Sequence, residues 1–117
     1  MTRPAHADTD TADRAATGDG TVYAAIEAGG TKWVCALADG DGRLLARHRF
    51  ATRDPDSTLA EAADWLQAAT AAQAGTDARP AGLGIASFGP LELDPASPRH
   101  GRLLRTPKPG WSDADLR

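Results

Sequence analysis

Residues 22–37 constrain the fold of this chain more than any other segment. A short apolar run ends at Glu27, two glycines and a Thr-Lys pair follow, and a second apolar run resumes at Trp33. Both runs are enriched in β-branched and aromatic residues, so they predict strands at 22–26 and 33–38. The connection between them leaves room only for a tight turn, and this layout is typical of a hairpin that binds phosphate.

The turn residues carry the chemistry that phosphate binding requires. Gly29 and Gly30 have no Cβ, so their backbone N–H groups can lie close to phosphate oxygens. Thr31 adds a hydroxyl donor and Lys32 a positive charge, while Glu27 is placed to hold Mg²⁺ through the waters of the ion. The Walker A and dinucleotide-binding patterns are absent. The same residues would suit equally well a plain hairpin in which the glycines only turn the chain, so the pattern alone leaves both interpretations open.

The rest of the pattern predicts an α/β fold, with a three-strand meander followed by a helix and a further strand. A turn signal at 39–42 leads into a third strand at 43–50, whose charged second half indicates an exposed sheet edge. A loop at 51–56 precedes the helix, whose start is predicted at Thr58 by a capping box with Glu61. The apolar residues of this helix have helical spacing: Leu59, Ala62, Ala63, Leu66 and Ala69. A single helix leaves one face of such a sheet uncovered.

A fourth strand at 82–86 leads into two loops of possible functional importance. Ligands collect at the carboxyl ends of strands in open α/β sheets, so Ser87, Gly89 and Pro90 are candidates for a pocket wall, although a Gly-Pro pair also simply ends a strand. The segment 106–111 is a rigid turn with an aromatic ring, which by itself indicates no function.

Composition excludes several classes of protein. The formal net charge is −3, which argues against a general nucleic-acid binder, and no stretch approaches the roughly 20 apolar residues of a membrane span. The single cysteine, Cys35, excludes an internal disulfide and is expected to be a small buried hydrophobe in a cytoplasmic protein. The three histidines are too scattered for a zinc site. Residues 1–20 lack Leu, Ile, Val, Phe and Trp and are expected to be a disordered tail.

Three motifs, taken in their order, indicate a family. Ile-Glu-Ala-Gly-Gly-Thr-Lys at 26–32, Gly-Ile-Ala-Ser-Phe-Gly-Pro at 84–90 and Thr-Pro-Lys-Pro-Gly-Trp at 106–111 resemble the N-terminal part of ROK (repressor, ORF, kinase) sugar kinases. Glu27, where most ROK glucokinases carry Asp, and the 106–111 segment point to the bacterial fructokinase branch. The resemblance implies the N-terminal part of an actin-like ATPase (ribonuclease H-like) domain, with residues 21–117 as a partial N-terminal lobe.

The resemblance also implies an activity, the transfer of the γ-phosphoryl group of ATP to the 6-hydroxyl of fructose. ATP and Mg²⁺ would be the cofactors and a sugar the small-molecule partner. A full-length protein of this family can form a homodimer, and neither nucleic acid nor a membrane is an expected partner. The implied site residues are Glu27 for Mg²⁺, then Gly29, Gly30, Thr31 and Lys32 for the phosphates, and Ser87, Gly89 and Pro90 for the border of the sugar pocket.

One departure from the family is severe. The general base of ROK kinases is an aspartate in an Asp-x-Asn segment, and Asp113 and Asp115 are not in that context. The second phosphate loop, the adenosine-binding segment and the Cys-rich zinc motif of the family would lie beyond Arg117. We therefore expect an N-terminal fragment, from a truncated or split gene or a partial sequence, that contains no catalytic residue and is inactive alone.

Three alternatives remain. A ROK glucokinase or another hexokinase would share the phosphate loop. A non-catalytic, sugar-responsive ROK regulator would need an N-terminal helix-turn-helix, and residues 1–20 show no apolar helical pattern. A stand-alone nucleotide-binding module would have to enclose a nucleotide with one hairpin and one helix.

Overall fold

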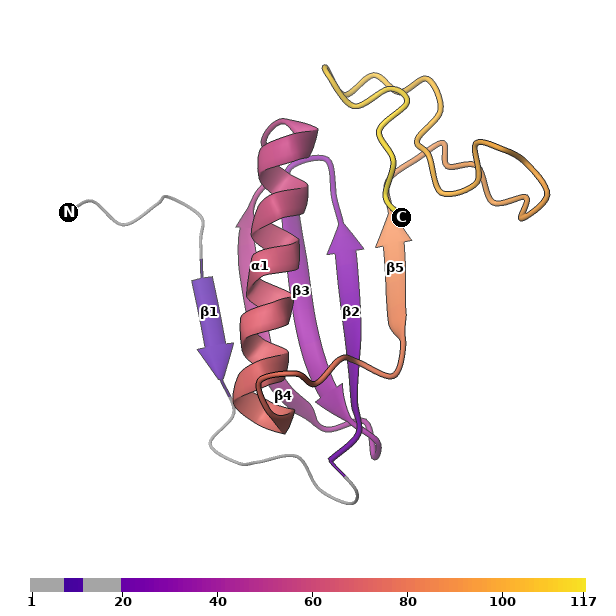
Figure 1. Cartoon of the computed structure of the whole chain (residues 1–117). Helices are drawn as coiled ribbons and strands as arrows, with labels where there is room; N and C mark the ends of the chain where they lie inside the picture. The colour runs from indigo at the N-terminus through magenta and orange to yellow at the C-terminus, as the bar shows by residue number, and fades with distance from the viewer. Residues whose placement is uncertain (1–7, 12–19) are drawn as a thin grey trace.

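The computed structural model describes residues 8–11 and 20–117, which form one mixed sheet and one helix. The elements are β1 (Asp8–Thr11), β2 (Val22–Ala28), β3 (Lys32–Asp39), β4 (Leu44–Ala51), α1 (Pro55–Ala74) and β5 (Leu83–Ser87). The strand order is β1-β4-β3-β2-β5, and α1 lies across one face of the sheet (Figure 1). Among the described residues, no helix has the length and hydropathy needed to cross a membrane.

The predicted meander, helix and fourth strand are confirmed. β2 pairs antiparallel with β3, which pairs antiparallel with β4, and β5 returns parallel to β2 after the helix. Burial along β2 alternates strictly, with Val22 and Ile26 buried and Tyr23 and Glu27 exposed. This period of two arises because successive side chains of a strand lie on opposite faces of the sheet.

The predicted start of the helix is wrong. Helix α1 begins at Pro55 and has Asp54 as its N-cap, whose Oδ2 accepts a hydrogen bond from the Ser57 N–H at 2.9 Å. Proline suits the first helical position because no intrahelical partner exists there for an N–H group. Thr58, the expected cap, is buried, and its hydroxyl oxygen accepts a hydrogen bond from the Arg53 N–H at 2.9 Å. The Asp-Pro pair was therefore the stronger start signal, and 55–56 belong to the helix instead of the loop.

Two expectations at the N-terminal side of the sheet also fail. The prediction of a disordered tail over 1–20 is wrong for Asp8–Thr11, which form β1; residues 1–7 and 12–19 lie outside the described residues. β4 is not the sheet edge, because β1 pairs with it in antiparallel register.

The apolar core lies between α1 and the sheet. The strand residues buried there are Val22, Ala24, Ile26, Ala28, Trp33, Cys35, Leu37, Leu45, Ala46 and Phe50. From the helix, Ala62 is buried, and Leu59, Leu66 and Ala69 pack against the same residues as predicted. Ala63 is exposed, contrary to prediction. Thr70 is buried, and its hydroxyl donates to the Leu66 carbonyl at 2.7 Å, so the burial leaves no unpaired polar group on this side chain.

The opposite face of the sheet carries no helix in the described structure (Figure 1). On this open face Ala25 and Glu27 of β2 and Gly84 and Ala86 of β5 are exposed. The expectation that one helix leaves a face uncovered is therefore confirmed for the described residues. Residues 88–117 follow β5 and lie beyond its carboxyl end, where Leu103, Trp111 and Leu116 are buried against the core.

Candidate functional site

The turn between β2 and β3 is built on Gly29. Its N–H donates to the Lys32 carbonyl at 2.9 Å, and a Cβ added at Gly29 would lie 2.6 Å from that same carbonyl oxygen. Thr52 holds the turn from the end of β4, since its hydroxyl donates to the Gly29 carbonyl at 2.7 Å and its N–H donates to the Thr31 carbonyl at 2.9 Å. The N–H and C=O groups of Gly29 are therefore both used in hydrogen bonds that hold the turn together, and its N–H is not available to a ligand.

Gly30 and Thr31 form the tip of this turn. Within the described part of the chain, neither amide N–H has a hydrogen-bond acceptor. A Cβ added at Gly30 would meet no atom within 4 Å, so the space beside the tip is open. Adjacent backbone N–H groups without an internal acceptor are the donors that bind anions in phosphate loops.

Glu27 lies on the open face, directly before the turn. It is exposed and stands opposite Val34 of β3 and beside Ala86 of β5. A shallow hollow of about 460 Å³ lies here, and Glu27 is the one charged residue among those that line it. The hollow is otherwise lined by Ala25, Ile26, Val34, Ala36, Gly84, Ile85 and Ala86.

The loop after β5 lies at the same end of the sheet as this turn. The Phe88 N–H donates to the Ala28 carbonyl at 2.8 Å, which joins the loop to the last residue of β2. The Ser87 hydroxyl donates to the Phe88 carbonyl at 2.7 Å, so its proton is used locally while its oxygen can still accept. The Pro90 carbonyl accepts from the Leu104 N–H at 2.8 Å, and Gly89 is exposed.

Trp111 brings the third motif to this end of the sheet. Its ring is fully buried, with ring centroids 5.8 Å from Trp33 and 5.7 Å from Phe88. Its indole N–H donates to the Arg53 carbonyl at 2.8 Å, just before α1. The structure therefore gathers all three motifs, which are far apart in the sequence, at the carboxyl ends of β2 and β5 (Figure 1).

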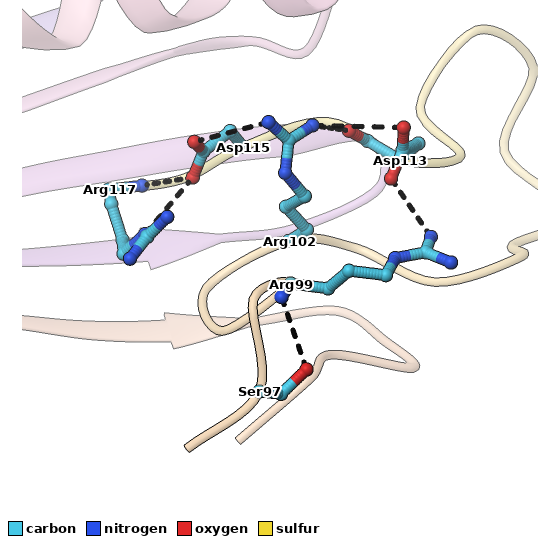
Figure 2. A network of polar contacts seen from close by, with 6 residues as sticks. All are labelled: Ser97, Arg99, Arg102, Asp113, Asp115 and Arg117. Atoms are coloured by element: carbon cyan, nitrogen blue, oxygen red, sulfur yellow. Dashed lines mark hydrogen bonds and ion pairs between the residues drawn. The ribbon is translucent and has the colours of Figure 1, made fainter. Parts of the chain in front are cut away.

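A chain of ion pairs that the sequence did not reveal joins Arg99 and Arg102 to the last residues of the chain (Figure 2). Asp113 lies 2.8 Å from an Arg99 nitrogen and 3.7 Å from an Arg102 nitrogen. Asp115 lies 3.8 Å from Arg102 and 3.6 Å from Arg117, and the hydrogen bond from the Arg117 backbone N–H lowers its pKa. Both aspartates are therefore engaged with arginines, and neither has the arrangement of a general base.

Among the residues that the structure describes, neither Cys35 nor a group of acidic residues forms a second reactive centre. Burial, and after it the Glu61 carboxylate, raises the pKa of the Cys35 thiol to about 12. The thiolate is the nucleophilic form, so Cys35 is an inert core residue, as the sequence predicted. Within 8–11 and 20–117, no group of three or more His, Cys, Asp or Glu residues is arranged to hold a metal ion.

Comparison with known proteins identifies the family. The ROK family matches residues 23–117. This chain belongs to the ROK family. The resemblance seen in the three motifs is therefore confirmed. The β2–β3 turn lies within the residues that the family matches.

The curated relatives of this ROK chain are fructokinases. It is 42% identical over 98 residues to a fructokinase of Zymomonas mobilis, covering 84% of this chain and 32% of the relative. It is 39% identical over 92 residues to a fructokinase of Pediococcus pentosaceus, covering 79% of this chain and 29% of the relative. The chain thus spans about a third of the length of these relatives.

A solved structure shows the same fold. Glucokinase from Balamuthia mandrillaris, in complex with glucose, aligns with a TM-score of 0.56 and 22% identity, over 80% of this chain and 23% of the glucokinase. The architecture is that of the N-terminal part of an actin-like ATPase domain, as the motifs implied.

Proposed function

We propose that this chain forms the N-terminal part of the active site of an ATP-dependent sugar kinase, in which the β2–β3 turn binds phosphates of ATP. The observation that carries the proposal is the tip of this turn. The Gly30 and Thr31 N–H groups lack an acceptor in the described structure, and the space beside Gly30 is open. Both features are what a turn that binds an anion through its backbone requires.

The remaining turn residues supply charge. Phosphoryl transfer asks a protein mainly to position the reactants and to neutralise charge on the phosphate oxygens. Lys32 is exposed and has no ion-pair partner among the described residues, so its ammonium group is free to approach a phosphate. An exposed ammonium group without such a partner supports the phosphate-binding role of Lys32.

Glu27 fits a Mg²⁺ site of the kind that kinases use. Mg²⁺ keeps several waters and binds through one or two carboxylates together with the phosphates of its nucleotide. Glu27 offers one exposed carboxylate beside the turn, in a hollow otherwise lined by apolar and backbone groups. Bound there with ATP, the ion would neutralise charge on the phosphates, while Glu27 would hold its water shell in place.

The sugar proposed is fructose, phosphorylated on its 6-hydroxyl. The support comes from the fructokinase relatives and from the loop at Ser87, Gly89 and Pro90, which lies next to the turn and would border the sugar. The general base that accepts the hydroxyl proton is assigned to no residue of 20–117, because Asp113 and Asp115 are paired with arginines.

A chimera tests both parts of the proposal, the kinase activity and the choice of fructose as the sugar. Residues 22–117 would replace the matching segment of the full-length Zymomonas mobilis fructokinase, and ATP-dependent phosphorylation of fructose and glucose would be measured. We expect activity on fructose, and its loss in the same chimera carrying Gly30→Val, whose side chain would fill the space beside the tip. A folded chimera that binds ATP but phosphorylates no hexose would overturn the kinase proposal. Faster turnover of glucose than of fructose would overturn only the choice of sugar.

A further inference from the structure

Thr52 lies directly after β4 and outside the three motifs, yet it is bonded twice to the β2–β3 turn. Its hydroxyl donates to the Gly29 carbonyl at 2.7 Å, and its backbone N–H donates to the Thr31 carbonyl at 2.9 Å. These two carbonyls lie on either side of Gly30 in the sequence. One residue therefore holds the tip of the turn at both of its ends.

The bond from the hydroxyl sets the direction of the Gly30 N–H. The Gly29 carbonyl and the Gly30 N–H belong to the same peptide unit, which is trans. In a planar trans peptide the C=O and N–H groups point in opposite directions. Because the carbonyl is directed at the Thr52 hydroxyl, the N–H is directed away from Thr52, and it has no acceptor in the described structure.

The peptide between the two glycines needs an external contact to keep this direction. Glycine populates positive and negative φ about equally well, so a peptide unit flanked by two glycines can reverse at little steric cost. Reversal would turn the Gly29 carbonyl to the side where the Gly30 N–H now lies. A bond of 2.7 Å from the Thr52 hydroxyl opposes that reversal, because the carbonyl would lose its donor.

Thr52 is itself held in place through the next residue. The Arg53 N–H donates to the Thr58 hydroxyl oxygen at 2.9 Å, and the Arg53 carbonyl accepts from the Trp111 indole N–H at 2.8 Å. Thr58 and Trp111 are fully buried, and the Arg53 guanidinium lies 2.8 Å from the Glu61 carboxylate. The hydroxyl of Thr52 therefore extends from a segment that α1 and the third motif fix independently of the turn.

We propose that Thr52 is a positioning residue of the phosphate site, whose hydroxyl keeps the Gly30 N–H directed at a phosphate of bound ATP. The inference rests on the proposed function, because that N–H is one of the two groups assigned there to phosphate. A donor that is already oriented costs less to order when the ligand binds. Loss of the hydroxyl therefore weakens the binding of ATP and leaves the binding of the sugar unchanged.

Thr52→Val tests the proposal in the chimera with the Zymomonas mobilis fructokinase, because valine keeps the branched shape and removes the donor. The backbone bond to the Thr31 carbonyl remains, so the turn stays attached to β4. Thr52→Ser restores the hydroxyl. The matched control is Thr70→Val, since the Thr70 hydroxyl also donates to a carbonyl, that of Leu66, at 2.7 Å but within α1. The KM for ATP, the KM for fructose and the melting temperature are measured for each.

We expect Thr52→Val to raise the KM for ATP about tenfold, the factor for one misdirected donor to a charged group, with the KM for fructose unchanged. Thr52→Ser and Thr70→Val should keep the KM for ATP of the parent chimera. Thr52→Ala, which lacks both the hydroxyl and the branch, should behave as Thr52→Val. A residue that only stabilises the fold would lower the melting temperature and change the KM values for both substrates.

A second measurement needs no ATP and uses the full 117-residue chain. Nitrogen-15 relaxation gives the order parameter of the Gly30 N–H. We expect it to fall from about 0.85, typical of rigid backbone, to below about 0.6 in Thr52→Val. Thr52→Ser should keep the order parameter of the parent chain.

The outcomes separate this inference from the proposed function. A Thr52→Val chimera with the parent's KM for ATP, equal rises for ATP and fructose, or an unchanged order parameter at Gly30 would overturn the role of Thr52. If Gly30→Val abolishes ATP binding while Thr52→Val leaves it intact, only the role of Thr52 fails. If the Gly30→Val chimera still binds ATP as the parent does, the proposed function fails, and the role of Thr52 fails with it.

Discussion

The two faces of the sheet are made by alternate residues of the same strands, yet one face is buried under α1 and the other is exposed. On the α1 face, Trp33, Cys35 and Leu37 are at most 1% exposed and pack under the helix. On the open face, Glu27 is exposed and lies in a hollow beside the β2–β3 turn. The comparison teaches that stability resides on one face and the candidate chemistry on the other, so the face that a substitution touches should decide which property it changes.

The largest expected effect is on the α1 face, at Trp111. Trp111→Ala removes a fully buried ring that contacts Trp33 and Phe88. We expect the free energy of unfolding to fall by about 3–5 kcal/mol, the range for large aromatic truncations in a core. Urea denaturation followed by tryptophan fluorescence measures it.

The control for Trp111 is Trp111→Phe, which keeps an aromatic ring and removes the hydrogen bond to the Arg53 carbonyl. It should cost clearly less than the alanine variant. If the two variants unfold at the same urea concentration as the parent chain, Trp111 is not a core residue and the contrast between the faces fails at this end of the sheet.

A pair of neighbouring glycines sharpens the comparison within one turn. Gly29→Ala would place a Cβ 2.6 Å from the Lys32 carbonyl oxygen, whereas Gly30→Ala meets open space, and neither glycine has a positive φ. We expect Gly29→Ala to lower the free energy of unfolding by about 1–3 kcal/mol, as overpacking does. Gly30→Ala should change it by less than about 0.5 kcal/mol.

The two glycine variants should also differ in the cause of any change in ATP affinity, which is measured in the chimera with the Zymomonas mobilis relative. Gly30→Ala should weaken ATP binding while the melting temperature stays that of the parent chimera. Equal destabilisation by the two substitutions would show that the tip of the turn is as closely packed as its base.

Glu27→Gln tests the open face for function without changing side-chain size. In the chimera we expect kcat to fall by about tenfold, equivalent to about 1.4 kcal/mol of transition-state stabilisation, with little change in the KM for fructose. Stability should not change, because Glu27 is exposed. Steady-state kinetics across a magnesium titration gives the measurement.

Asp64→Asn is the matched control for Glu27, because it removes one exposed negative charge on α1, away from the turn. It should leave kcat and the magnesium dependence as they are in the parent chimera. A Glu27→Gln chimera with that same unchanged profile would remove Glu27 from the metal site.

The smallest effect concerns the helix cap and acts only in acid. The hydrogen bond from the Ser57 N–H lowers the pKa of Asp54 from its ordinary value of 3.8. The folded state therefore binds this proton less tightly than the unfolded state, so the stabilisation is complete above the ordinary pKa and is lost as the pH falls through the folded pKa. Asp54→Asn keeps a capping oxygen but cannot titrate.

Thermal melts of the parent chain and Asp54→Asn, recorded between about pH 2 and pH 7, measure this difference. The melting temperature of the variant should fall less steeply in acid than that of the parent chain. Parallel curves for the two proteins would show that the Ser57 hydrogen bond contributes nothing to the acid dependence of stability.

The local part of the fold could be predicted from the sequence because its signals are short-range. Runs enriched in β-branched and aromatic residues predicted β2 and β3, and the Asp-Gly turn predicted the third strand of the meander. The start of α1 was misplaced, although its signal is also local, because two competing caps lie within one turn of each other. Asp54 followed by Pro55 prevails over Thr58, whose hydroxyl faces inward and bonds to Arg53.

The candidate site could be predicted only in its parts. The glycines at 29 and 30 looked equivalent in the sequence, and the structure separates them into a packed base and an open tip of the turn. Nothing in the sequence placed Trp111 against Trp33, or joined Asp113 and Asp115 to arginines. β1 was missed because a short polar segment acquires strand structure only from the β4 edge that it pairs with.

The sequence by itself determined the order of the elements from β2 to β5, the family and the chemical nature of the turn, since each depends on neighbouring residues or on motifs read along the chain. Tertiary structure alone decided which face of the sheet α1 covers, which edge β1 occupies, and that three distant motifs meet at the carboxyl ends of β2 and β5. The physical reason is that alternation along a strand fixes two faces without saying which is covered. That choice depends on contacts between residues far apart in the chain, where packing area and the closure of long loops set the outcome.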